Sequence, residues 1–264
     1  MPVIIGQQKL LSAINSYTMQ TLPKSLMLIG PSGCGKHTVA KYVAEKFQLD
    51  FIEIDDAVTA ADLDEFTHRT LNTLYLIDLN KFSEKQQNQF LKFVEEPSKS
   101  VYVVLVTNSE VSVINTLMNR CVKYTFEPYT IKQVEAIKNT TINSKAFDIF
   151  KTPGKLLNLT DDSFCTTMDL ANSIVSNIAS VPYPVVLATA TKINYKDLYN
   201  KVDFNLFFDT IEYIAFEDFK NNNIKTSFTI FKITTEFKQL AAKQTLIKEM
   251  LMINYLTNLW EAVR

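Results

Sequence analysis

A glycine-rich loop constrains this chain more than any other feature of its sequence. Three of its five glycines fall between Gly30 and Gly35, and Lys36 follows them directly. The loop comes after an apolar run, 26–29, and opens a helical pattern, 38–47. In such a strand–loop–helix unit the backbone N–H groups converge on one anion, and a lysine adds positive charge beside it. The sequence therefore predicts a phosphate-binding loop.

The loop fits the P-loop pattern G-x-x-x-x-G-K-S/T at every fixed position except the last. His37 occupies the place of the hydroxyl that would bind Mg²⁺, and Thr38 stands one position late. His37 as a metal ligand is one interpretation, and we favour the other, a packing or solvent-facing residue. Nucleotide binding is thus predicted more strongly than hydrolysis. The predicted phosphate-binding residues are Gly30, Pro31, Ser32, Gly33, Cys34, Gly35, Lys36, His37 and Thr38.

The composition indicates a globular chain without a strongly basic surface. With 264 residues, of which 47% are hydrophobic and 21% charged, it has room for two or three domains and a sizeable core. With a net charge of −1, any contact with nucleic acid would be made through a local patch or inside an assembly. The three cysteines share no metal-ligand spacing, and the first residues do not form a signal sequence, which favours reduced thiols in the cytoplasm. No apolar run reaches membrane-spanning length, so we expect no membrane partner.

Apolar runs alternate with helical patterns through the first half of the chain. Strands alternating with helices, and strands that are apolar almost throughout, favour a parallel sheet covered on both faces, that is, an α/β fold. After Pro128 the patterns become helical, and from 169 onward they are mostly so, with one apolar stripe through Leu198, Val202 and Leu206. The predicted strands are residues 25–29, 51–54, 74–77, 101–106 and 122–126.

Asp78 ends the third of these apolar runs. When a P-loop precedes it in the sequence, a carboxylate at the end of such a strand typically reaches the Mg²⁺ of a bound nucleotide. Without a P-loop, it would often be only a strand-end cap. Hydrolytic proteins usually carry an acidic residue next, which polarises the attacking water. Here the next residue is Leu79, which can neither orient nor deprotonate water. Weak or absent hydrolysis is therefore predicted.

The segment that begins at Asp78 resembles the Walker B region of DNA polymerase clamp-loader subunits. That family reads roughly D-E-A-D-x-M/L-T/S and then Q-N-A-L-L-K-x-L/I-E-E-P. The resemblance runs in order from about Ile5 to Leu157. The matching segments are 5–7 (the box against adenine), 78–83 and 87–97 (Walker B and the helix after it), 104–108 (sensor 1), 119–121 (the S-R-C motif, with Asn for Ser), 126–128 (F-x-P) and 153–155 (P-G-R/K, sensor 2).

The resemblance also implies roles for single residues. Asn108 would be sensor 1 and Lys155 sensor 2, both near the nucleotide, and Lys155 facing water is the equal alternative. Arg120 would be an arginine finger acting on a neighbouring subunit, and the alternative is a surface arginine paired with a carboxylate. The implied cofactors are ATP and Mg²⁺, with Asp78 reaching the metal through the nucleotide.

The resemblance is to delta-prime-like AAA+ subunits. It implies a P-loop domain at 1–128, a helical lid at 129–160 and an all-helical collar domain for oligomerisation at 161–264. No cysteine lies between Cys34 and Cys121, so the zinc module of many bacterial clamp loaders is absent, as in divergent or viral forms. The cytoplasm would then be the host's if the chain is viral.

The implied function is that of a clamp-loader subunit in DNA replication. It would bind ATP, hydrolyse it little or not at all, and act beside related ATPase subunits, the sliding clamp and primer–template DNA in a pentamer-like hetero-oligomer. The alternative is an active AAA+ ATPase, such as a motor-type clamp-loader subunit or a helicase loader, against which Leu79 speaks. A P-loop kinase for small substrates has no support, because no substrate lid follows Asp78.

Overall fold

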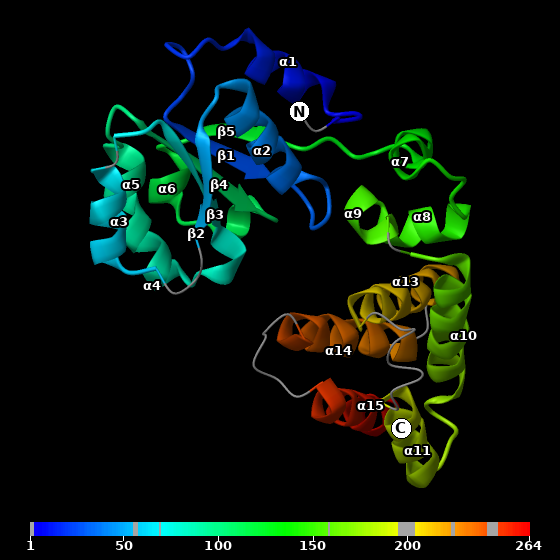
Figure 1. The fold of residues 1–264 in the computed structure, drawn as a ribbon. Coiled ribbons are helices and arrows are strands. Elements are labelled where there is room, and N and C mark those ends of the chain that lie inside the picture. The colour runs from blue at the N-terminus through cyan, green and yellow to red at the C-terminus, as the bar shows by residue number, and fades with distance from the viewer. Residues whose placement is uncertain are drawn as a thin grey trace. The chain divides into compact units, whose positions relative to one another are not determined.

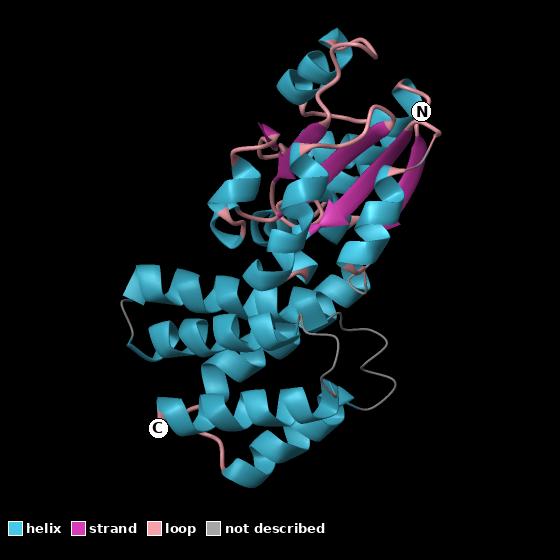
Figure 2. Cartoon of the chain, turned by 90° about the vertical axis from the view of Figure 1, so that its left-hand side faces the viewer, coloured by secondary structure: helices cyan, strands magenta, loops and turns pink. Residues whose placement is uncertain are grey.

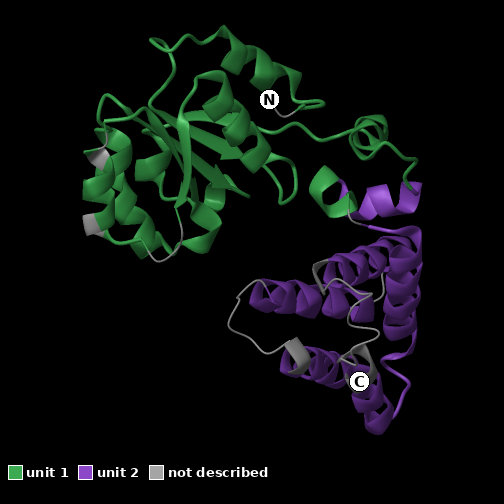
Figure 3. Ribbon diagram, in the orientation of Figure 1, with its two compact units in different colours: residues 1–142, 152–157 green, residues 143–151, 158–264 purple. Residues whose placement is uncertain are grey.

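The computed structural model describes residues 3–54, 58–68, 70–157, 159–194, 204–222, 225–241 and 248–264. The chain forms two compact units (Figure 3). The first comprises residues 1–142 and 152–157, and the second comprises residues 143–151 and 158–264. The finer division into P-loop domain, lid and collar stays a prediction.

A parallel sheet organises the first unit. Within the described residues it has five strands in the order β2-β3-β4-β1-β5, and each adjacent pair is parallel. Because β4 lies between β1 and β3, the carboxyl ends of these three strands are neighbours at one edge of the sheet, where α/β folds bind ligands. The strands are β1 (Ser25–Ile29), β2 (Asp50–Ile54), β3 (Thr73–Asp78), β4 (Val101–Thr107) and β5 (Val122–Thr125).

Helices cover both faces of this sheet (Figures 1 and 2). On one face Leu26 and Leu28 of β1 pack in a core with α1 (Gln8–Ser16) and α2 (Lys36–Lys46). On the other face Met27 and Ile29 pack in a second core with α3 (Ala60–Thr67), α5 (Leu91–Glu95) and α6 (Asn115–Met118). Successive side chains of a strand thus enter two different apolar cores, which explains why the buried strands are apolar at almost every position. The predicted α/β fold is confirmed.

In the sequence, Ser83 and Gln86 predict a capping box, and the pattern after them predicts one helix as far as Glu96, which Pro97 ends. The structure contains the capping box, with Ser83 N donating to Gln86 Oε1 at 3.0 Å. However, α4 (Glu84–Gln87) passes into the 3₁₀ turn η2 (Asn88–Phe90) before α5 begins. The amide of Gln87 is buried and bonds the backbone of Ser112 and Ile114, near the turn η3 (Glu110–Ser112). These tertiary contacts outweigh the local helical preference.

Two further helices complete the first unit, α7 (Ile131–Lys138) and α9 (Pro153–Leu156). The second unit is helical throughout its described residues, as predicted for this part of the chain. Its helices are α8 (Ser144–Phe150), α10 (Asp161–Asn177), α11 (Tyr183–Asn194), α13 (Phe204–Asn222), α14 (Lys225–Ala241) and α15 (Lys248–Val263).

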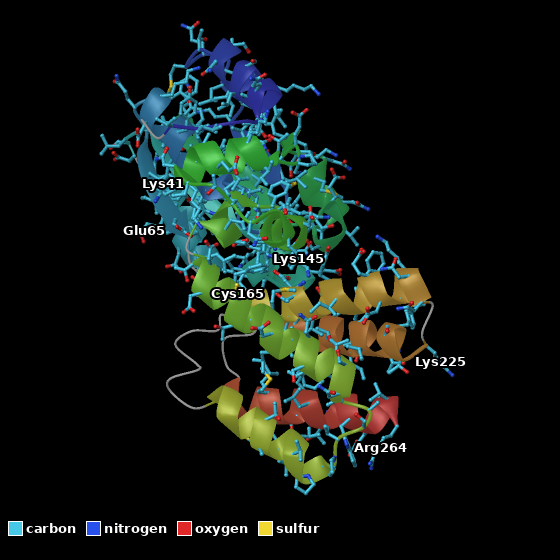
Figure 4. All side chains as sticks on the ribbon, turned by 90° about the vertical axis from the view of Figure 1, so that its right-hand side faces the viewer. Lys41, Glu65, Lys145, Cys165, Lys225 and Arg264 are labelled. Carbon is cyan, nitrogen blue, oxygen red and sulfur yellow. The ribbon has the colours of Figure 1, made fainter. Side chains whose placement is uncertain are left out.

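Aromatic side chains fill the core of the second unit. Phe207 and Phe208 of α13 lie edge-on to Tyr255 of α15, with ring centroids 6.4 and 5.0 Å away, and the Tyr255 hydroxyl bonds Thr234. Cys165 lies exposed on α10 (Figure 4). In the predicted stripe, Leu198 and Val202 lie outside the described residues. No helix in the described part of the chain is long and apolar enough to cross a membrane.

Candidate nucleotide-binding site

The glycine-rich loop connects β1 to α2, as the sequence predicts. Gly33 and Gly35 have φ angles of 80° and 97°, a left-handed conformation that side chains disfavour. Gly35 is the N-cap of α2, which therefore begins at Lys36 with its first backbone N–H groups lacking partners within the helix. These groups and the positive end of the helix dipole form a ready site for an anion.

Lys36 is almost fully buried and folds back onto its own loop. Its Nζ donates to Gly30 O at 2.6 Å, to Pro31 O at 3.0 Å and to Asn108 Oδ1 at 3.0 Å. Burial lowers the pKa of Lys36, and the Asp78 carboxylate opposes that effect. Within the described residues, these hydrogen bonds of the buried cation all go to neutral carbonyl oxygens, so a phosphate would add a directly bonded negative charge.

A hydrogen-bonded chain joins Lys36 to Asp78 across three strand ends. Asn108, after β4, accepts from Lys36 through its side chain and donates its backbone N–H to Asn80 Oδ1 at 3.0 Å. Asn80 in turn donates its side-chain amide to Asp78 Oδ1 at 2.5 Å and its backbone N–H to the same oxygen at 3.1 Å. Sequence reasoning missed Asn80. The only available signal was its place two residues after an aspartate, where such turns form.

Leu79 occupies the position at which hydrolytic relatives carry an acid. Its side chain is 1% exposed and belongs to the core on the α3–α6 face of the sheet. Asp78 lines the cavity while Leu79 packs in this core. The side chain at this position therefore contributes to stability and brings no polar atom to the cavity.

The residues expected to hold Mg²⁺ fit it only in part. Asp78 lines the cavity with a carboxylate, one of whose oxygens already accepts two bonds from Asn80. His37 supplies an imidazole instead of a hydroxyl, and its Nε2 lies 3.3 Å from Glu53 Oε1. Among the described residues, no group of three or more metal-binding side chains converges. Asp78 is the one predicted residue that would reach an ion carried by the phosphates of a nucleotide, because Mg²⁺ prefers oxygen ligands.

The turn before α9 packs directly on the loop. Gly154 N donates to Gly33 O at 2.8 Å, and Thr152 Oγ1 donates to Ser32 O at 3.0 Å. A Cβ on Gly154 would lie 2.7 Å from Gly33 Cα, so the close approach requires glycine. Lys155, the predicted sensor 2 residue, lies half-buried at this turn.

A cavity of about 400 Å³ lies over the loop. This volume suits a small ligand such as a nucleotide. The polar part of its lining comprises the loop, Asp78, Asn80 and Asn108. Gln7 joins the N-terminal segment to the residues after β5. Its side-chain amide donates to Glu127 O and accepts from Glu127 N, both at 2.8 Å. The apolar lining comprises Val3, Ile4, Ile5, Tyr129, Ile137 and Leu157.

The structure brings most of the predicted residues to this cavity. Gly30 and Pro31 contribute through the carbonyl groups that hold Lys36, and Lys155 lies beside the lining rather than in it. Arg120 lies elsewhere, after α6, and is not among the described residues that line the cavity. Its Nε is 2.9 Å from Glu95 Oε2, and its Nη1 donates to Thr116 O at 2.8 Å. Any action of Arg120 on a nucleotide would therefore concern another chain.

The fold and the site together define a AAA+ P-loop protein. The sheet order, the loop after β1, the aspartate ending β3 and the asparagine after β4 all belong to that architecture. A RuvB structure from Thermotoga maritima aligns over 98% of this chain and 87% of its own, with a TM-score of 0.50 and 16% identity. At that identity the likeness bears on the fold alone.

Sequence comparisons indicate which AAA+ proteins this chain is similar to. Residues 69–130 match the family model described as "DNA polymerase III, delta subunit". DNA polymerase III subunit gamma of Buchnera aphidicola is 25% identical over 248 residues, which are 75% of this chain and 67% of that protein. DNA polymerase III subunit delta' of Bacillus subtilis is 32% identical over 92 residues, 33% of this chain and 28% of that protein. Over these segments the chain is similar to clamp-loader subunits of DNA polymerase III, the delta-prime subunit among them.

Proposed function

We propose that this clamp-loader subunit binds ATP, hydrolyses it little or not at all, and offers Arg120 to the nucleotide of a neighbouring subunit. The observation that carries the proposal is an intact phosphate cradle beside a buried Leu79. Binding requires backbone donors and a cation, and both are in place. Hydrolysis requires a group that orients water, and the residue at that position packs in an apolar core.

The nucleotide would lie along the cavity with its phosphates on the loop. The N–H groups of the loop and the Lys36 ammonium would hold the phosphates, because the bonds from the lysine to neutral carbonyls would be exchanged for bonds to a charged group. The base would lie against the apolar part of the lining, which includes Ile5 and Tyr129. Since position 37 offers no hydroxyl, we expect binding to depend less on Mg²⁺ than a standard P-loop would.

The finger role of Arg120 is supported by its placement away from its own cavity and by the planar fork that a guanidinium presents. In this proposal the chain assembles with related ATPase subunits in a pentamer-like arc. That assembly would act on the sliding clamp at primer–template DNA. This subunit would contribute a conformation that depends on its bound nucleotide, and one catalytic arginine for a neighbouring subunit.

Titration and turnover experiments on the isolated chain test the nucleotide half of this proposal. A fluorescent ATP analogue is titrated against the unaltered chain and Lys36→Ala, with Mg²⁺ and with a chelator, and ATP turnover is measured in parallel. We expect binding that Lys36→Ala abolishes and that the chelator weakens only slightly, with turnover near background. A robust ATPase rate that Lys36→Ala removes would instead establish the alternative, an active motor-type ATPase.

Reconstitution tests the other half. Arg120→Ala is assembled with the related ATPase subunits, and normal stoichiometry is checked by gel filtration. We expect the DNA- and clamp-stimulated ATPase rate to fall by roughly 10³-fold or more at the site that Arg120 serves, the range known for arginine fingers. An assembled Arg120→Ala complex that hydrolyses ATP and loads the clamp normally would remove Arg120 from the site.

A further inference from the structure

Arg120 is held at two points by its own chain. Its Nε lies 2.9 Å from Glu95 Oε2, and its Nη1 donates to Thr116 O at 2.8 Å. A guanidinium is planar, so two contacts on different nitrogens fix both its position and the orientation of its plane. The side chain is therefore ordered before any ligand arrives.

The two contacts leave part of the guanidinium available. A guanidinium has five N–H donors, and within the described part of the chain no contact reaches Nη2 of Arg120. The arginine side chain is 33% exposed and that of Glu95 is 51% exposed, so the pair lies open at the surface. An incoming anion would find an oriented cation with unused donors.

The residues that hold Arg120 stand on rigid elements. Glu95 is the last residue of α5, directly after Phe93 and Val94, which are both buried in the core on that face of the sheet. Thr116 lies in α6, next to Leu117, which is buried in the same core. Because both helices are anchored in one core, the geometry that they impose on Arg120 is fixed by packing rather than by loops.

We propose that Glu95 is a positioning residue for Arg120. This inference rests on the proposed function, in which Arg120 acts on a neighbour's nucleotide. A free arginine would have to lose its rotational freedom when the site assembles, whereas one already oriented by Glu95 does not. Stability does not explain the pair, since exposed ion pairs contribute little to folding. Removing Glu95 should consequently leave the fold intact and affect the neighbour's catalysis.

The test uses the reconstituted complex and compares three variants. Glu95→Ala removes the contact and should lower kcat for the neighbour's hydrolysis by about tenfold with KM unchanged, because a catalytic group displaced by ~1 Å commonly costs up to 10²-fold. Glu95→Gln keeps a side-chain oxygen that can lie beside Nε and should retain most of the rate. Glu96→Ala is the matched control, because Glu96 is also exposed and its substitution removes the same charge one residue away.

A double variant separates positioning from a general structural effect. If Glu95 acts through Arg120, then adding Glu95→Ala to Arg120→Ala should cause no further loss of kcat. An NMR signal of the Arg120 Nε–H in the isolated chain should also be sharp and slow to exchange, and Glu95→Ala should abolish it.

Each remaining outcome is decisive. If Arg120→Ala lowers kcat but Glu95→Ala does not, or if the two losses add, the positioning role is refuted and the finger stands. If Glu96→Ala lowers the rate as much as Glu95→Ala, the effect is one of net charge and the inference also fails. If Arg120→Ala itself has no effect, the finger proposal falls and Glu95 has nothing to position.

Discussion

Gly154→Ala tests whether the turn before α9 really presses on the phosphate loop. Gly154 lies in the first turn of a helix and has no left-handed φ, so on backbone grounds alanine should be the better residue. Without any clash the change would stabilise the chain by about 0.4–1 kcal/mol, because alanine restricts the unfolded state. The local geometry thus predicts a gain in stability.

Packing of the turn against the loop makes the expected effect of Gly154→Ala on stability unfavourable. The new Cβ would lie 2.7 Å from Gly33 Cα and 2.9 Å from Gly33 O, where ordinary contact begins at 3.4 Å. Both neighbours are backbone atoms of the loop and cannot rotate away. Overpacking of this kind costs about 1–3 kcal/mol. Separating the turn from the loop would also break the bond from Gly154 N to Gly33 O, worth about 1 kcal/mol. We therefore expect a net loss of roughly 1–3 kcal/mol.

Urea unfolding followed by circular dichroism measures this free energy, and amide exchange at residue 154 reports the broken bond. Thr152→Val is the matched variant, because it removes the bond from Thr152 Oγ1 to Ser32 O without adding bulk at the turn. It should cost about 1 kcal/mol. Gly154→Ala that is as stable as the unaltered chain, with an unchanged exchange rate at 154, would refute the close packing of turn and loop.

Three further predictions concern single side chains. Leu79→Ala should lower the free energy of unfolding by about 2–5 kcal/mol, because it empties part of a buried core, and denaturant unfolding measures that loss. Asn80→Ala should weaken the binding of the fluorescent ATP analogue roughly fivefold, the equivalent of about 1 kcal/mol, because the backbone N–H of Asn108 loses its acceptor. An unchanged Kd would contradict this. Burial raises the pKa of Cys121 to about 12, so at pH 8 little thiolate exists. Iodoacetamide should therefore alkylate the exposed Cys165 first, and mass spectrometry that finds Cys121 labelled as fast would overturn this order.

The sheet could be predicted from sequence because its strands lie between two apolar cores. Short runs that are apolar at almost every position, as in 25–29 and 101–106, are typical of strands buried on both faces, and the structure places strands there. Residues 111–118 also have a helical pattern, and that pattern predicts a single helix there. There the structure has a 3₁₀ turn and only a short helix, since Gln87 bonds the backbone at Ser112 and Ile114.

The parts of the site that sequence could not supply depend on which strands are neighbours. The bond between Asn80 and Asn108 exists because β3 pairs with β4, and no local pattern encodes that pairing. The contact between Glu95 and Arg120 likewise joins two helices through a shared core. The P-loop was predictable because its residues are consecutive and its conformation is dictated by its own glycines.

The burial of Leu79 has an evolutionary consequence. A single substitution to glutamate would place a carboxylate in an apolar core, where an unpaired charge costs several kcal/mol, a large fraction of the ~5–15 kcal/mol that stabilises a typical domain. An intermediate sequence with that glutamate would fold poorly before it could gain any catalytic benefit. Acquiring an acid here would require the surrounding core to change first. For a lineage carrying this core, mutation at this position alone would therefore not give a stable hydrolytic subunit.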